Sequence, residues 1–204
     1  MNNNDQDLHW KLCKDYFSIV TSTSKTEISL EELCAYSKVS YKKATEIIPK
    51  NNFDYDYYFL KILVSRIDFE ALDQLKNDIA DDTISTVYDK ILEGITIRFE
   101  KYLPYKQALK LLSSSLNLKS KYFLKLFETN NSYMLNLLEL VEERQVCSFK
   151  IIKSITLNII FTRTMDIFLK EEKNELNSTL RNLDKYLSDV EDMGVMLGII
   201  QNKL

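Results

Sequence analysis

Glycine and proline are almost absent from this chain, with three glycines and two prolines among 204 residues. All-β and α/β proteins depend on tight turns, and these two residues supply many of the backbone angles that such turns need. Apolar residues instead recur with a 3.6-residue period over long segments, and 45% of the residues are hydrophobic, which is enough for a packed core. The sequence therefore predicts an all-α fold.

The segment 29–48 predicts two short helices separated by a sharp turn. Ser29 is a suitable N-cap for the first helix, and Glu32 three residues later would complete a capping box. Ser40 can cap the second helix, which Pro49 cannot continue because its ring removes a donor and clashes with the preceding turn. Two short helices joined in this way form a helix-turn-helix, whose second helix can enter the major groove of DNA.

Longer helices are expected on either side of this motif. Their predicted ranges are 5–21, 54–76, 82–102, 104–115, 119–143, 148–170 and 176–190. The helix at 148–170 is apolar around much of its circumference, so it must be central in a bundle or covered by a partner. The last helix carries apolar residues at alternating steps of four and three, a heptad pattern that suits a helical interface. We assign residues 1–53 to a helix-turn-helix head and residues 54–204 to a helical bundle.

Several classes of function are disfavoured by the composition. The net charge is −3, so no global excess of positive charge favours nucleic acid. The three cysteines and the single histidine show no metal-ligand spacing, and reduced thiols in a cytoplasmic protein are the simpler interpretation. Neither a signal peptide nor a membrane span is expected. Without a glycine-rich phosphate loop or a nucleophile–base pair, we expect no enzyme and no cofactor.

With this layout, the chain resembles the TetR family of bacterial transcriptional regulators. The family's turn has a small or β-branched residue followed by Ala-Gly-Val-Ser, and the matching residues here are 37–40, Ser-Lys-Val-Ser, followed by a second helix at 41–48. The resemblance extends to 59–72, 87–112 and 162–187, which are similar to α-proteobacterial members. It implies a nine-helix, Ω-shaped homodimer with DNA-binding heads and a ligand-sensing bundle.

The resemblance also implies roles for individual residues of the head. Ser40, Tyr41, Lys42 and Lys43 would lie at the exposed start of the recognition helix, where base edges are read. Thr45 and Lys50 would hold phosphates, which position a protein on DNA without specifying sequence.

Several features of the head depart from the family pattern. Thr45 stands in place of the recognition-helix tyrosine, Ile48 in place of the aromatic residue that ends this helix, and the basic N-terminal arm is absent. Lys38 replaces the turn glycine and must adopt a left-handed conformation, at a cost of about 1 kcal/mol, or turn differently. Residues 1–53 carry seven basic and seven acidic side chains, so the head as a whole is neutral.

The last two predicted helices would pair between the two copies of the homodimer. The interface candidates are Ile155, Ile159, Leu176, Leu180, Leu183, Leu187 and Val190. An apolar ligand would bind inside the bundle, although the same residue spacing is also typical of a plain core. The ligand-site candidates are Phe99, Leu109, Phe123, Phe127, Met134, Phe161 and Met165.

An alternative interpretation stays open. The TetR-fold lipid-binding family of ubiquinone biosynthesis resembles the C-terminal half about as well, and its members do not bind DNA. The missing basic N-terminal arm and the missing turn glycine favour this alternative, in which the bundle would hold an isoprenoid lipid. The tail 193–200, MGVMLGII, would then dock on a membrane as part of an amphipathic helix.

Overall fold

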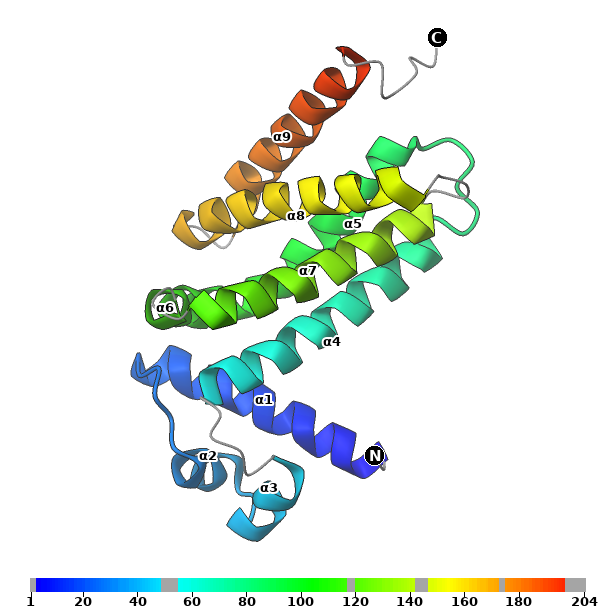
Figure 1. The fold of residues 1–204 in the computed structure, drawn as a ribbon. Coiled ribbons are helices and arrows are strands. Elements are labelled where there is room, and N and C mark those ends of the chain that lie inside the picture. Colours follow the sequence, from blue (N-terminus) through cyan, green and yellow to red (C-terminus); the bar gives the residue numbers. More distant parts are fainter. Residues whose placement is uncertain (1–2, 49–54, 117–119, 142–146, 173–174, 197–204) are drawn as a thin grey trace. The chain divides into compact units, whose positions relative to one another are not determined.

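The computed structural model describes residues 3–48, 55–116, 120–141, 147–172 and 175–196. Within these ranges every regular element is helical, which confirms the predicted all-α class for the described residues (Figure 1). The helices are α1 (Asn3–Thr23), α2 (Leu30–Ser37), α3 (Tyr41–Ile47), α4 (Tyr55–Asp78), α5 (Val87–Tyr102), α6 (Lys106–Leu116), α7 (Ser120–Val141), α8 (Cys147–Lys170) and α9 (Asn177–Met196). A short 3₁₀ turn, Leu103–Tyr105, leads into α6.

The chain forms two compact units. Unit 1 comprises Met1–Ile67 and Pro104–Leu126, and unit 2 comprises Asp68–Leu103 and Phe127–Leu204. Helices α4 and α7 each begin in unit 1 and end in unit 2. In this division, α6 and the first part of α4 lie in the same unit as α1, α2 and α3. The predicted boundary between a head and a bundle at residue 53 stays a prediction.

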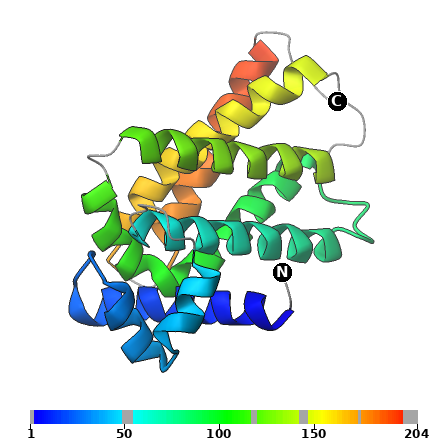
Figure 2. The same ribbon diagram turned by 60° about the horizontal axis from the view of Figure 1, so that its bottom comes forward.

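The interior of unit 1 joins α1 to α4 and α6. Helix α6 packs beside α1 (Figure 2), where the rings of Phe17 and Tyr105 meet edge to face at a centroid distance of 5.6 Å. The ring of Tyr16 on α1 stacks on that of Phe59 on α4 at 4.7 Å. These aromatic side chains are large and well packed, so they supply much of the apolar burial that holds the head together.

Helix α5 begins five residues later than the predicted start at residue 82. The carboxylate of Asp82 accepts hydrogen bonds from the backbone N–H groups of Ile84 and Ser85 at 2.9 and 3.0 Å, which forms a turn where a helix was expected. Thr86 then caps α5 in a capping box with Asp89. Ile84, which lies within the predicted helix range 82–102, is therefore part of this turn and is 93% exposed.

The leucines of α9 are mostly part of the core of unit 2. Helix α9 packs on α8 (Figure 1) and also contacts α5. The hydroxyl of Tyr88 on α5 donates to the carboxylate of Asp184 on α9 at 2.8 Å. Leu176, Leu183 and Leu187 are buried in the chain itself. The heptad pattern therefore corresponds largely to an internal contact, and these three leucines are not surface residues available to a second copy.

The one glycine whose surroundings the structure describes, Gly94 on α5, lies at a close approach of helices in unit 2. A Cβ atom built there would lie 2.6 Å from Cδ1 of Leu137 on α7 and 2.9 Å from Cδ2 of Leu75 on α4. The hydroxyl of Tyr133 on α7 also donates to the Gly94 carbonyl oxygen at 2.7 Å. Glycine at this position lets α4 and α7 pack against the backbone of α5.

No described helix combines the length and the hydrophobicity that a bilayer-spanning segment requires.

Candidate functional site

The helix-turn-helix forms as the sequence predicts. The Ser29 hydroxyl oxygen accepts from the Glu32 backbone N–H at 3.1 Å, and the Glu32 carboxylate accepts from the Ser29 N–H at 3.0 Å, which confirms the capping box of α2. The Ser40 hydroxyl oxygen accepts from the Lys43 N–H at 3.4 Å and caps α3. Both helices therefore have defined starting points, and these fix the register of the motif.

Lys38 adopts the left-handed conformation that its position in the turn requires, with φ 54° and ψ 39°. The backbone N–H groups of Lys38 and Val39 both donate to the Cys34 carbonyl oxygen, so the end of α2 is satisfied. The Lys11 ammonium on α1 donates to the Ser37 carbonyl oxygen at 2.8 Å. A cation at a helix C-terminus is favourable because the last carbonyl groups carry partial negative charge.

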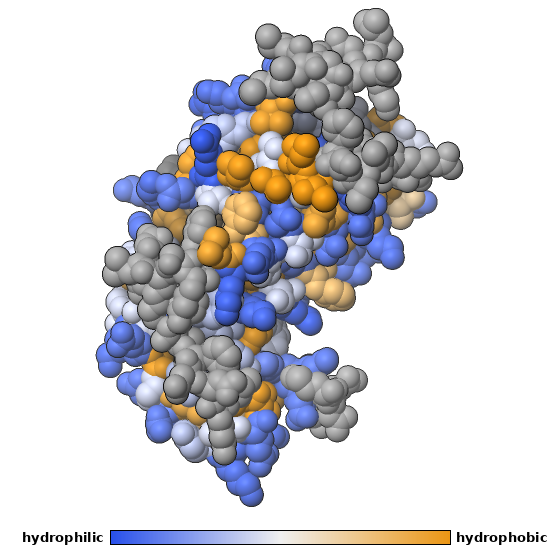
Figure 3. All heavy atoms as spheres, viewed as in Figure 1, coloured by the Kyte–Doolittle hydropathy of each residue, from blue (hydrophilic) through white to orange (hydrophobic). Residues whose placement is uncertain are grey.

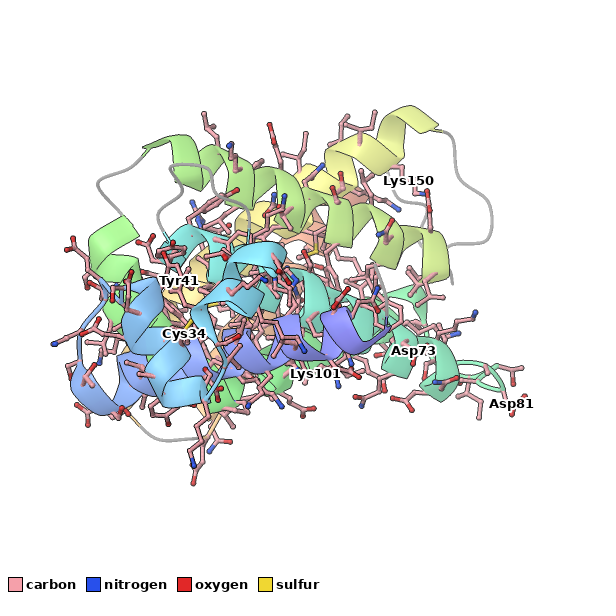
Figure 4. All side chains as sticks on the ribbon, turned by 90° about the horizontal axis from the view of Figure 1, so that it is seen from below. Cys34, Tyr41, Asp73, Asp81, Lys101 and Lys150 are labelled. Atoms are coloured by element: carbon pink, nitrogen blue, oxygen red, sulfur yellow. The ribbon has the colours of Figure 1, made fainter. Side chains whose placement is uncertain are left out.

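Helix α3 buries one side and exposes its first turn. Ala44 and Ile48 are buried. The residues predicted to read base edges are all exposed: Ser40, Tyr41, Lys42 and Lys43. Tyr41, which is 50% exposed, marks the start of α3 in Figure 4, with Cys34 on the neighbouring α2. The structure therefore gathers a hydroxyl, a phenol and two ammonium groups on one short surface.

Of the two predicted phosphate contacts, Thr45 and Lys50, the structure describes only Thr45. Thr45 is half-buried, and its hydroxyl donates to the Lys42 carbonyl oxygen at 2.9 Å, so its proton is already used within α3. Lys50 lies outside the described residues. Thr45 can therefore accept a hydrogen bond from a partner but is poorly placed to donate one to a phosphate.

Charges around this surface are mixed but locally separated. Lys38, Lys42 and Lys43 are exposed on the turn and on α3, where Glu46 is the exposed acid. On the α2 side, Glu32 is engaged by its capping bond and by Lys25 at 3.7 Å. The backbone hydrogen bond from Ser29 is the main cause that lowers the pKa of Glu32. The basic residues therefore cluster on the turn and α3 within a head that is neutral as a whole.

The predicted ligand-site residues are mainly core. Phe99, Met134, Phe161 and Leu109 are buried, whereas Phe127 and Met165 are half-buried. The rings of Phe99 and Phe161 stack at 5.1 Å in unit 2. Leu109 and Phe123 belong to unit 1, and the side chain of Phe123 lies outside the described part of the structure.

A buried polar cluster in unit 2 was missed by the sequence reasoning. Arg98 on α5 is fully buried, and its Nε donates to the Asp68 carboxylate at 2.6 Å. Its Nη2 donates to Oδ1 of Asn130 at 2.8 Å. The guanidinium carbon lies 4.2 Å from the ring centroid of Tyr133 and 4.3 Å from that of Phe161. In the sequence, Arg98 interrupts the apolar face of α5, one turn after Ile95 and one turn before Tyr102. This interruption was the feature from which a buried polar cluster could have been predicted.

The cluster strongly perturbs its titratable groups. Burial raises the pKa of the Asp68 carboxyl, and the neighbouring guanidinium only partly offsets this effect. Burial also raises the pKa values of Tyr102 and Tyr133, so both phenols are neutral at physiological pH. Nη1 of Arg98 and Oδ1 of Asn158 are buried without a hydrogen-bond partner.

An exposed apolar stripe runs along α8. Ile151, Ile152, Ile155 and Ile159 are between 40% and 64% exposed, and they recur at helical spacing. Figure 3 shows apolar side chains gathered over this helix in unit 2. Of the interface candidates on α9, Val190 is also exposed and Leu180 is half-buried. We call the four isoleucines the α8 stripe.

Thiol and metal chemistry have little support in the described residues. Cys13 and Cys34 are buried free thiols, and the Cys13 thiol donates to the Phe59 carbonyl oxygen at 3.5 Å. Among the residues that the structure describes, no group of three His, Cys, Asp or Glu side chains is placed to hold a metal ion.

Comparison with known proteins adds no relative. No protein-family model matches the chain, and a search of the curated proteins finds no significant match.

Proposed function

We propose that the protein is a TetR-like transcriptional regulator that binds operator DNA through its helix-turn-helix. The observation that carries the proposal is the exposed first turn of α3, where Lys42 and Lys43 stand beside Ser40 and Tyr41 on a well-capped motif. Ammonium groups near phosphates release counterions and provide sequence-independent affinity, while hydroxyl and phenol groups can reach base edges. Lys38 adds a third cation at the turn.

The regulator would act in the cytoplasm as a homodimer, with the α8 stripe of each copy forming the contact. Contiguous exposed apolar side chains on a helix commonly mark an interface, because their burial removes apolar surface from water. A two-fold contact would use the same stripe on both copies. An apolar ligand bound in unit 2 would change DNA affinity; this last element follows from the TetR resemblance.

The test of DNA binding is a variant that neutralises two charges while keeping helix propensity. The double variant Lys42→Gln, Lys43→Gln is expected to bind duplex DNA about tenfold more weakly at low salt, because two positive charges are lost from the DNA-facing start of α3. Fluorescence anisotropy over a salt series should also show a salt slope that is smaller by about two. The matched control is Lys76→Gln on α4, another exposed lysine, which should leave both values unchanged.

Equal affinity of wild type and the double variant, or no binding by either, would reject this function. The lipid-binding alternative would then be preferred, since the missing basic arm and the missing turn glycine favour it. Part of its predicted docking segment, 197–200, lies outside the described residues. Extraction and mass spectrometry of co-purified lipid would test that alternative directly.

The test of the homodimer removes apolar area from the α8 stripe. Replacing Ile155 and Ile159 together by alanine is expected to weaken dimerisation about a thousandfold, because the dimer then carries two truncations in each copy and each removes roughly 1 kcal/mol of apolar burial. Sedimentation over a concentration series measures the effect. Ile84→Ala serves as control, because its side chain is exposed on a loop and lies outside the stripe. A wild-type protein that is monomeric at micromolar concentration would contradict the proposed dimer.

A further inference from the structure

The unused group of Arg98 is the most unusual polar feature of the interior. Two of the guanidinium nitrogens are occupied by Asp68 and Asn130, and the third, Nη1, has no hydrogen-bond partner although the residue is fully buried. A buried donor without a partner loses its hydration and gains nothing in return. Nη1 therefore presents two N–H groups that a bound oxygen atom would satisfy.

A matching acceptor comes from α8. Asn158 is fully buried, and its Nδ2 donates to the Phe127 carbonyl oxygen at 2.9 Å, while its Oδ1 has no partner. Asn158 lies one turn before Phe161, whose ring is next to the Arg98 guanidinium at 4.3 Å. Residues three apart share a helix face, so Asn158 and Phe161 lie on the same side of α8. On α7, the Asn158 partner Phe127 likewise lies one turn before Asn130, which accepts from Arg98.

The charges of this region favour an uncharged ligand. Arg98 is balanced by Asp68 at 2.6 Å, so an additional anion would have to be buried beside an existing carboxylate. The surrounding walls are aromatic, with Phe99 stacked on Phe161 and tilted against Phe168. A flat apolar body with one polar group suits this environment better than an ion does.

We propose that unit 2 binds an uncharged aromatic molecule that carries a hydroxyl group. The hydroxyl oxygen accepts from Nη1 of Arg98, and the hydroxyl proton is donated to Oδ1 of Asn158. Room for the ring comes from side-chain movement, for which Met165 is suited: it lies one turn after Phe161, and its unbranched thioether chain repacks easily. The proposal deepens the proposed function by giving its ligand a chemical class, and it rests on that function only for the effect on DNA.

The experiment uses three probes of similar size on the full chain without DNA: phenol, anisole and toluene. Phenol can accept and donate, anisole can only accept, and toluene can do neither. Calorimetry is expected to show phenol binding at least about tenfold more tightly than toluene, because it satisfies a charged donor, with anisole in between. Equal affinities of phenol and toluene, or no binding of any probe, would overturn the proposal.

Two variants locate the site. Arg98→Met should bring the affinity for phenol down to that for toluene, and Asn158→Leu should remove the preference for phenol over anisole. Asn158→Leu keeps the Arg98–Asp68 pair, so it remains informative if Arg98→Met does not fold. An unchanged preference in a folded variant would show that phenol binds elsewhere. Because these measurements contain no DNA, their failure is distinguishable from a failure of DNA binding.

Discussion

Replacing Arg98 by methionine is expected to lower the free energy of unfolding by about 3–5 kcal/mol. Methionine fills a similar volume, but it leaves the Asp68 carboxylate, whose side chain is only 14% exposed, without its cation. It also removes the donor to Asn130 and the contact with the ring of Tyr133 at 4.2 Å. Urea unfolding at neutral pH, followed by circular dichroism, measures the loss.

Two measurements distinguish an electrostatic cause of this loss of stability from a loss of packing. One uses a double variant, and the other uses the pH dependence of the free energy of unfolding. The double variant Asp68→Leu, Arg98→Met should recover most of the stability, because apolar groups can replace a buried ion pair at little cost. Without the guanidinium, the raised pKa of Asp68 should rise further. A carboxyl whose folded-state pKa is raised destabilises the fold as pH increases through that pKa, so the deficit of Arg98→Met should shrink below the ordinary value of 3.8. A deficit that is independent of pH and persists in the double variant would contradict the electrostatic explanation.

Replacing Gly94 by valine is expected to lower the free energy of unfolding by about 2–3 kcal/mol. Already the first added carbon would lie 2.6 Å from Leu137 and 2.9 Å from Leu75, and the branched side chain needs still more room. The gain in helix propensity over glycine, under about 1 kcal/mol, does not compensate for this overlap. Thermal and urea unfolding of the variant measure the change.

A second substitution provides the control for steric overlap. Leu137→Ala alone should destabilise by about 2–5 kcal/mol through the cavity that it leaves. Combined with Gly94→Val it should cost less than the sum of the two changes, because the valine occupies part of that cavity. Strict additivity would show that the cost at Gly94 is not contact with Leu137.

Local sequence signals predicted the structure best where a side chain and its own backbone decide the outcome. The hydroxyls of Ser29 and Ser40 cap α2 and α3 at the predicted positions, and Lys38 adopts the left-handed conformation, one of the two possibilities that the sequence left open. These features depend on residues within one or two turns. The exposure of Lys42 and Lys43 followed from the same local reasoning, because Ala44 and Ile48 define the buried side of α3.

Features that depend on distant partners were harder to predict. A heptad pattern reports that one face of a helix is apolar but does not report what covers it; Leu183 is covered by its own chain. The start of α5 was missed because the apolar period continues through Ile84, whereas Asp82 binds the backbone locally. The Arg98 cluster joins α4, α5 and α7, and no spacing within a single helix predicts such a meeting.

The left-handed turn at Lys38 places stability and surface charge in direct competition at a single position. Its backbone angles are those for which glycine is the natural choice, while its exposed ammonium group adds to the basic surface of α3. Replacing Lys38 by glycine would remove the strain in the backbone and would at the same time remove one positive charge from the surface. Position 38 is thus a point at which selection for a sturdier head and selection for a more positive one would favour different residues.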